Sequence, residues 1–251
     1  MNDESFWHQR YSQQANWTGD LRKYLYNKTS LDHAERVLEV GCGTGVILEE
    51  LATRKYLDLH GVDILPGRLS TAHVHSPQAF LTCADARSLP FPRQSFDISL
   101  CHFLLLWVPD PLQALLEMKQ VTRTGGHVLA MAEPDYYERT DKPEGLALLG
   151  PWQTEGLRRQ GADPGIGHRL GDLFVQAGIR LIEAGPLRGW DAVLLSPDEQ
   201  EMEWRVLEYD LKGIASQDEI QQMKSLDKEA WRSGRRQLQV PIYYAWGTVQ
   251  E

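Results

Sequence analysis

The stretch Arg36-Val37-Leu38-Glu39-Val40-Gly41-Cys42-Gly43-Thr44-Gly45 decides the fold of this chain. Its first half has the apolar, β-branched pattern of a buried strand, and its second half places a glycine at every second position. Glycine has no Cβ, so it lets the backbone turn sharply and lets a ligand lie against it. We therefore expect a strand, a ligand-binding loop and a helix from Val46 to about Arg54, whose first N–H groups face the loop.

The spacing of the glycines bears on the kind of ligand. A nicotinamide fingerprint has the pattern G-x-G-x-x-G, whereas Gly41, Gly43 and Gly45 form G-x-G-x-G, preceded by Glu39. This difference weakens the dinucleotide interpretation. Because a glycine loop alone is a common turn signal, the choice of ligand depends on the elements that follow.

Length and composition indicate one globular domain. The chain has 251 residues, of which 42% are hydrophobic and 24% charged, and a chain of this size can bury a large core without disulfides. It has no apolar run of the roughly 18 residues that a membrane span needs. Its acidic, polar start does not resemble a secretory signal. We expect a cytoplasmic protein without a membrane partner.

The charge and the potential metal ligands narrow the partners further. A net charge of −9 argues against nucleic acid, because binding to a phosphate backbone needs a cationic surface. The arginines within residues 232–236 form one basic cluster, which we interpret as a solvated helix end. His73 and His75, two apart, face opposite sides of a helix. No metal is expected, and no zinc spacing is present in the cysteines, Cys42, Cys83 and Cys101.

Acidic residues follow the next two predicted strands. The strand 56–63 ends in Asp63, where a carboxylate can accept two ribose hydroxyls, as several nucleoside cofactors require. Asp85 follows the strand 79–83, and a fourth strand, 96–102, ends at His102. Because ligands lie beyond the carboxyl ends of parallel strands, these positions point to one pocket.

Together these elements resemble class I S-adenosylmethionine (SAM) dependent methyltransferases of the small-molecule branch, the ubiquinone/menaquinone-biosynthesis type with a methyltransferase type 11 domain. Residues 39–45 resemble the first motif of that family. Residues 84–91 resemble the segment whose acid meets the adenine amino group, followed by a Leu-Pro-Phe turn. The resemblance covers about residues 36–133 and then follows only the order of elements. It implies an enzyme, a transferase, with SAM as methyl donor and S-adenosyl-L-homocysteine as product.

The resemblance assigns a cofactor-binding role to residues at the four strand ends and on the N-terminal helix. In this family an N-terminal helix often folds over the cofactor. The resemblance therefore implies a cofactor contact by Tyr11, with Trp7 and Arg10 as further candidates. The other expected cofactor-binding residues are Glu39, Gly41, Cys42, Gly43, Gly45, Asp63, Ile64, Asp85, Ala86, Cys101 and His102.

Methyl transfer from a sulfonium needs the acceptor atom in line with the S–CH₃ bond, so positioning and desolvation supply most of the rate. No universal catalytic residue is therefore expected. If the acceptor loses a proton, a base must take it, and the candidates are His102, Glu133, Tyr136 and His168. A hydrogen-bonded structural histidine at a strand end is the alternative interpretation of His102.

The alternation of strands and helices predicts an α/β fold with right-handed crossovers. The resemblance implies a Rossmann-like seven-stranded sheet, mostly parallel with an antiparallel last strand, plus helical cap insertions. We expect the sixth strand at 179–187 and the last at 240–249. A single domain, 1–251, is expected to comprise N-terminal helices at 1–34, a SAM-binding core at 35–135, and caps at 136–167 and 190–238.

Large aromatic rings gather in the two insertions. Trp152, Trp190, Trp204 and Trp231 lie there and can line a pocket for an apolar acceptor, although each alone is also a reasonable packing residue. Enzymes that methylate exocyclic amines usually have an Asn or Asp before Pro-Pro and an aromatic residue after the fourth strand, and residues 101–107 lack this pattern. A small-molecule acceptor is favoured.

The favoured function is methyl transfer from SAM to a small, partly apolar or aromatic acceptor, at oxygen, carbon or nitrogen, in a capped pocket. The alternative is a catalytically idle SAM-binding or interaction protein. A nicotinamide-dependent oxidoreductase is disfavoured by the glycine spacing. We expect a monomer or homodimer that binds no nucleic acid.

Overall fold

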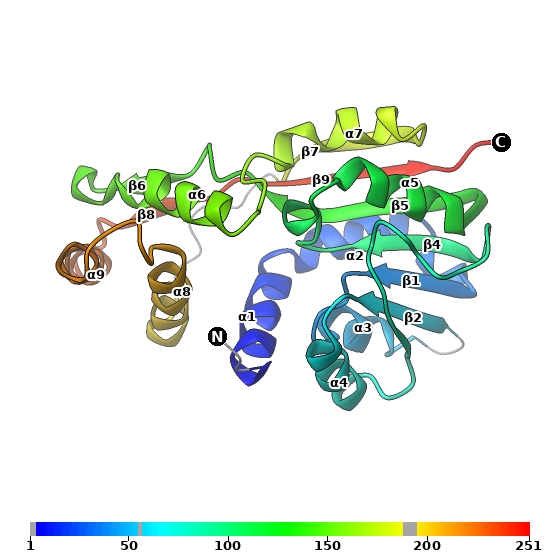
Figure 1. The fold of residues 1–251 in the computed structure, drawn as a ribbon, viewed down its shortest axis with the longest axis horizontal. Coiled ribbons are helices and arrows are strands. Elements are labelled where there is room, and N and C mark those ends of the chain that lie inside the picture. Colours follow the sequence, from blue (N-terminus) through cyan, green and yellow to red (C-terminus); the bar gives the residue numbers. More distant parts are fainter. Residues whose placement is uncertain (1–3, 55–56, 188–194) are drawn as a thin grey trace.

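The computed structural model describes residues 4–54, 57–187 and 195–251. Figure 1 shows a sheet with helices on both faces and, at one end of the molecule, a group of helices together with short strands. Trp190, and the first residue of the predicted strand 56–63, lie outside the described residues.

In the described part of the chain, one seven-stranded sheet has the strand order β3-β2-β1-β4-β5-β9-β7. Its strands are β1 (Arg36–Val40), β2 (Asp58–Asp63), β3 (Phe80–Cys83), β4 (Phe96–Cys101), β5 (Thr122–Pro134), β7 (Arg180–Pro186) and β9 (Ile242–Thr248). The neighbours from β3 to β5 pair in parallel, and β9 is antiparallel to both β5 and β7. The predicted α/β fold with an antiparallel last strand is confirmed, and that strand begins at Ile242 rather than at residue 240.

Helices cover both faces of this sheet, as Figure 1 shows. They are α1 (Glu4–Trp17), α2 (Gly19–Lys28), α3 (Val46–Leu51), α4 (Pro66–His75), α5 (Pro111–Val121) and α7 (Leu170–Gln176), with single 3-10 turns η1 (Leu31–His33), η2 (Leu105–Trp107) and η4 (Gly167–Arg169). Successive residues of a strand face opposite sides: Val37 packs with α2 and α3, and Leu38 with α5 and α7. The central strand is apolar because both of its faces are buried.

The two insertions fold together into one cap. The first contains β6 (Thr140–Lys142), η3 (Glu144–Leu146) and α6 (Leu149–Arg159), and the second α8 (Pro197–Asp210), α9 (Gln217–Arg232) and β8 (Gln237–Gln239). β6 and β8 pair antiparallel. The shared apolar cluster contains Leu146, Leu149, Trp204, Leu207, Leu211, Ile220, Met223 and Ala230. The sequence predicted helical caps but not this strand pairing, which joins positions far apart in the chain.

A buried ionic network holds the cap together. Asp141 on β6 accepts hydrogen bonds from Arg139 (2.7 Å) and Arg236 (2.6 Å). Arg236 also reaches Asp227 on α9 (2.5 Å), which accepts from the indole N–H of Trp204 on α8 (2.7 Å). Burial alone would raise the pKa of Asp141, but the two arginines hold it below its usual value. The prediction of a solvated basic cluster is therefore wrong for Arg236, which is 7% exposed.

Among the described residues, none of the helices combines the length and the apolar character needed to cross a bilayer.

Candidate active site

A cavity of about 560 Å³ opens at the carboxyl ends of β1, β2 and β4. Its walls are the glycine loop and strand ends on one side, α1 beside them, and residues of α6 and α8 opposite. Because the carboxyl ends of parallel strands share one edge, residues distant in sequence meet here. The cavity therefore lies between the sheet core and the cap.

Most residues that the sequence assigned to cofactor binding line this cavity: Tyr11, Glu39, Gly41, Cys42, Gly43, Asp63, Ile64, Asp85, Ala86 and His102. Gly45 and Cys101 are not among the lining residues. A Cβ at Gly45 would lie 3.0 Å from Ala72 Cα, so this glycine lets α3 and α4 approach each other. Cys101 lies in the apolar core, where burial raises the pKa of its thiol well above the usual value.

The glycine loop adopts backbone angles that favour glycine. Gly41 has φ of 74° and Gly43 of 53°, both in the left-handed region. A Cβ would lie 2.5 Å from Leu104 Cδ1 at Gly41, and 3.2 Å from Tyr11 Cε2 at Gly43. The loop is therefore closely covered by side chains from α1 and from the segment after β4. A side chain at Gly43 would intrude on the cavity wall.

Two carboxyl groups face the cavity beside this loop. Asp63 Oδ2 accepts the N–H of Gly43 and its Oδ1 accepts that of Leu65, each at 2.9 Å, so Asp63 fixes the loop to the end of β2. Glu39 Oε2 is buried and has no hydrogen-bond partner among the described residues. Burial, and then the charge of Asp63, raise the pKa of Glu39 well above its usual value. An orphaned buried oxygen beside a cavity is suited to a polar ligand.

Asp85 lies at the far end of the same wall, after β3. Its carboxylate accepts from the backbone N–H of Arg87 (2.8 Å) and from the Arg87 guanidinium (2.6 Å). These hydrogen bonds lower the pKa of Asp85. Arg87, which the sequence did not single out, also lines the cavity. A ligand amino group at this carboxylate would share it with Arg87.

The N-terminal helix α1 forms the side wall. Tyr11 stacks on Trp7 with ring centroids 5.7 Å apart. Arg68 on α4 lies over both rings, 5.3 Å from the Tyr11 centroid and 5.8 Å from that of Trp7. Burial raises the pKa of the Tyr11 hydroxyl to about 12, so it stays protonated. α1 thus covers the glycine loop, as the resemblance implied.

His102 lines the cavity directly after β4. Its Nε2 lies 2.8 Å from Thr18 Oγ1, which also accepts from Arg22 Nη1 at 2.7 Å. Burial, and then the charge of Arg22, lower the pKa of His102 to about 3. The imidazole is therefore neutral at physiological pH, and it does not readily store a proton.

The other base candidates separate in space. Tyr136 lines the cavity, and burial raises the pKa of its hydroxyl to about 12. Glu133 is not among the lining residues. His168 on η4 is half exposed, pairs with Asp135 and lies outside the lining as well. His102 and Tyr136 therefore line the same cavity, whereas Glu133 and His168 do not.

Glu133 holds the backbone after β4. Its carboxylate accepts the N–H groups of Leu104 (2.9 Å), Leu105 (2.8 Å) and Leu106 (3.1 Å). Burial raises the pKa of Glu133 to about 7 against the opposing effect of these hydrogen bonds. Through these hydrogen bonds Glu133 positions the backbone of η2, which forms part of the cavity wall.

Comparison with known proteins agrees with this geometry. Residues 38–130 match the family model described as a methyltransferase domain. This segment runs from β1 into β5 and carries the glycine loop, Asp63 and Asp85. This match assigns the sheet core of the chain, residues 38–130, to a methyltransferase domain. The methyl donor of this family is SAM.

The chain is 32% identical over 158 residues to the malonyl-[acyl-carrier protein] O-methyltransferase of Halorhodospira halophila, covering 61% of this chain and 48% of that protein. It is 30% identical over 118 residues to the ubiquinone/menaquinone biosynthesis C-methyltransferase of Geobacter sp., covering 44% and 50%. The chain thus spans about half the length of these curated relatives.

Among solved structures, a methyltransferase from an antibiotic biosynthesis pathway of Anabaena variabilis is similar, with a TM-score of 0.66 and 16% identity over 90% of this chain and 95% of that one. At this level of identity the likeness concerns the fold alone.

The cap wall of the cavity contains residues that the sequence gave no reason to select. Leu157 and Gln160 come from α6 and its end, and Tyr209 and Asp210 from α8. Asp210 accepts from the amide groups of Gln153 (2.8 Å) and Gln160 (2.9 Å). Burial raises the pKa of Asp210. Among the described cap helices, it is the carboxyl group that lines this cavity.

A smaller cavity of about 50 Å³ adjoins the first and shares Arg10, Phe103 and Tyr136 with it. Of the tryptophans predicted to line an acceptor pocket, Trp231 lines this second cavity. Trp204 lies in the cap core and Trp152 packs against that core. Neither lines the described cavities, so packing explains them.

Proposed function

We propose that this protein transfers the methyl group of SAM to a small, largely apolar acceptor held between the glycine loop and the cap. The main support for this proposal is that one continuous cavity has the glycine loop in its wall at one side and cap residues at the other. Such a shape suits two ligands that must meet. The mixed sheet and the cap would then act as one domain.

The donor side offers groups that match the parts of SAM. Glu39, with its orphaned Oε2, would accept from the ammonium group, and Asp63 from the ribose hydroxyls. Asp85 and the backbone of Ala86 would meet the adenine, and the Tyr11 ring would cover the loop. When bound, SAM supplies an electrophilic methyl group, while these residues bind and orient it.

The acceptor side is mainly apolar. Phe103, Leu106, Leu157 and Val206 line it, and Trp231 lies in the adjoining small cavity. Apolar walls exclude water and favour an aromatic or partly apolar molecule. The polar groups at this side are few, and a hydroxyl donor at Tyr136 would fix the orientation of the acceptor.

Asp210 is our candidate for the group that takes a proton from the acceptor. It lines the cavity and its pKa is raised by burial, as suits a general base. His102 instead lines the cavity as a neutral group fixed by Thr18, so a hydrogen-bonding role suits it better than proton storage. Glu133 and His168 remain weaker candidates because neither lines the cavity.

The identity of the acceptor atom stays open among oxygen, carbon and nitrogen. The two relatives named above are an O-methyltransferase and a C-methyltransferase, so their names do not select one. A small-molecule acceptor, the absence of a nucleic-acid partner, a monomeric or homodimeric state and a cytoplasmic location stay predictions from the sequence. An idle SAM-binding protein is the alternative function.

Calorimetry with SAM and S-adenosyl-L-homocysteine tests the donor site. Gly43→Val adds a side chain against Tyr11 and should weaken binding at least tenfold, about 1.4 kcal/mol. Gly125→Val is the matched control, because Gly125 also has a left-handed φ of 78° but lies in open space. Absence of heat with both ligands, or equal binding by both variants, would contradict the proposal.

A further inference from the structure

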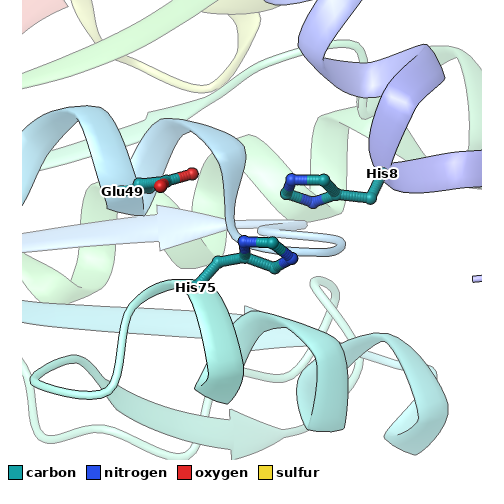
Figure 2. Close-up of side chains that lie close together, drawn as sticks. All are labelled: His8, Glu49 and His75. Atoms are coloured by element: carbon teal, nitrogen blue, oxygen red, sulfur yellow. The ribbon is translucent and has the colours of Figure 1, made fainter. Parts of the chain in front are cut away.

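Three potential metal ligands meet on the side of α1 that faces α3 and α4. They are His8 on α1, Glu49 on α3 and His75 in the last turn of α4, and one ligand atom from each lies within 4.8 Å of the others. Figure 2 shows the two imidazole rings side by side and the Glu49 carboxylate next to them. None of the three is among the residues that line the described cavities, so the cluster is separate from the methyl-transfer site.

The two imidazoles already lie against each other. Their centroids are 3.6 Å apart and their planes differ by 10°. His8 Nδ1 lies 3.0 Å from Thr44 Oγ1. With a proton on Nδ1 donated to Thr44, Nε2 of His8 is the nitrogen left for a ligand bond, the arrangement that usually orients a metal-binding histidine.

The electrostatics of the cluster favour the ligand form of His8. Burial, and then the neighbouring His75, lower the pKa of His8, which favours the neutral imidazole. The carboxylate of Glu49 is exposed and accepts no hydrogen bond from the described residues, which leaves its oxygens available. Neutral imidazole nitrogens and a carboxylate oxygen are the donors that zinc and its neighbours in the periodic table prefer.

We infer that His8, Glu49 and His75 form a binding site for a divalent transition-metal ion of the Zn²⁺ type. Three protein ligands and a partly exposed setting leave a fourth position for water. Nitrogen lone pairs lie in the ring plane, so one imidazole turns out of the stack when both bind one ion. If His75 is the ring that turns, His8 keeps its contact with Thr44.

A metal ion at this place would join three helices. α1 carries Trp7, Arg10 and Tyr11 on the cavity wall, and His8 on the same helix contacts Thr44 of the glycine loop. A bound ion would hold α1 against α3 and α4 and thereby stabilise the wall that covers the loop. Its role is structural, because its ligands do not reach the cavity.

The test is calorimetric titration of ZnCl₂ into the 251-residue protein, treated with a chelator, freed of any histidine tag and without SAM. We expect one ion per chain. His75→Gln should weaken binding at least about tenfold, since it removes a ligand. His73→Gln is the matched control, because His73 is exposed on the same helix and is not part of the cluster. The Zn²⁺ affinity of this variant should equal that of the wild type.

Two further readings tie the result to these residues. The Co²⁺-loaded protein should show visible absorption bands that are absent in His8→Gln and His75→Gln. Zn²⁺ should raise the melting temperature of the wild type and of His73→Gln, but not that of His75→Gln. No saturable binding, or binding that survives both His8→Gln and His75→Gln in folded protein, would overturn the inference. Because SAM is left out, neither result depends on the methyltransferase activity.

Discussion

Arg10 on α1 donates a hydrogen bond to Glu203 on α8 and thereby connects the N-terminal wall of the cavity to the cap. Arg10 lines both cavities and also lies over the Trp17 ring, 4.8 Å from its centroid. The side chains of Arg10 and Glu203 are 7% and 17% exposed. This pair is a direct polar contact between α1, the predicted cofactor cover, and the predicted acceptor wall.

Weakening this pair should loosen the cap. Glu203→Gln keeps the shape but removes a charge, so we expect the free energy of unfolding to fall by about 1–2 kcal/mol and the KM of the acceptor to rise more than the Kd of SAM. Urea denaturation measures the first effect. The control is Glu201→Gln on the same helix, where the ion pair with Lys224 is exposed and the loss should be below about 0.5 kcal/mol. Equal losses in the two variants would show that the pair has no special role.

Asp210→Asn should abolish proton removal if Asp210 is the base. We expect kcat/KM to fall by about 10² or more, while the Kd of SAM stays within a factor of about two because Asp210 lies at the cap side. Burial raises the pKa of Asp210, so wild-type activity should decline on the acid side at a higher pH than an ordinary aspartate would give. A variant with unchanged kcat/KM would remove Asp210 from the mechanism.

Glu133→Gln separates a positioning role from a catalytic one. Glutamine places an amide N–H₂ where one of the Leu104–Leu106 N–H groups needs an acceptor, so stability should fall by about 1–3 kcal/mol. Activity should fall modestly and keep the shape of its pH profile. If Glu133 is the base instead, activity will fall by orders of magnitude while stability changes little.

The same residue gives a pH dependence of stability. Burial raises the pKa of folded Glu133 to about 7 from an ordinary value of 4.5. The folded state therefore holds this proton more tightly, and the contribution of Glu133 to stability is full below pH 4.5 and is lost as pH rises to about 7. The unfolding free energy of the wild type minus that of Glu133→Gln should decline over this interval. A difference that rises with pH would mean that the carboxylate is favoured in the folded state.

The sheet and the donor side were predictable because their signals are local. An apolar strand, a glycine loop and an acid after the next strand follow one another over residues 36–63, and parallel pairing then brings the strand ends to one edge. This pattern located Glu39 and Asp63 on the cavity wall, and the end of the next strand located Asp85. Periodicity cannot tell whether a glycine faces ligand or helix, so Gly45 was assigned to the site although it packs against α4.

The cap and the cluster of His8, Glu49 and His75 were not predictable because they depend on distant contacts. β6 pairs with β8 across nearly a hundred residues, and this pairing buries Arg236 beside Asp141. Asp210 is one of several acids in α8, and nothing in the sequence distinguishes it. His8, Glu49 and His75 lie on three different helices, so their spacing forms no motif. Sequence patterns describe the donor side well and the acceptor side poorly.

Transfer of label from [methyl-³H]SAM to small molecules in a metabolite extract tests the central claim most directly. The account predicts a labelled, extractable product with the wild type and with Gly125→Val, and at least about tenfold less label with Gly43→Val at limiting SAM. The labelled fraction then identifies the acceptor for the Asp210→Asn experiment. If the wild type binds SAM by calorimetry but transfers no label above an enzyme-free control, the protein is an idle SAM-binding protein and the proposed function is wrong.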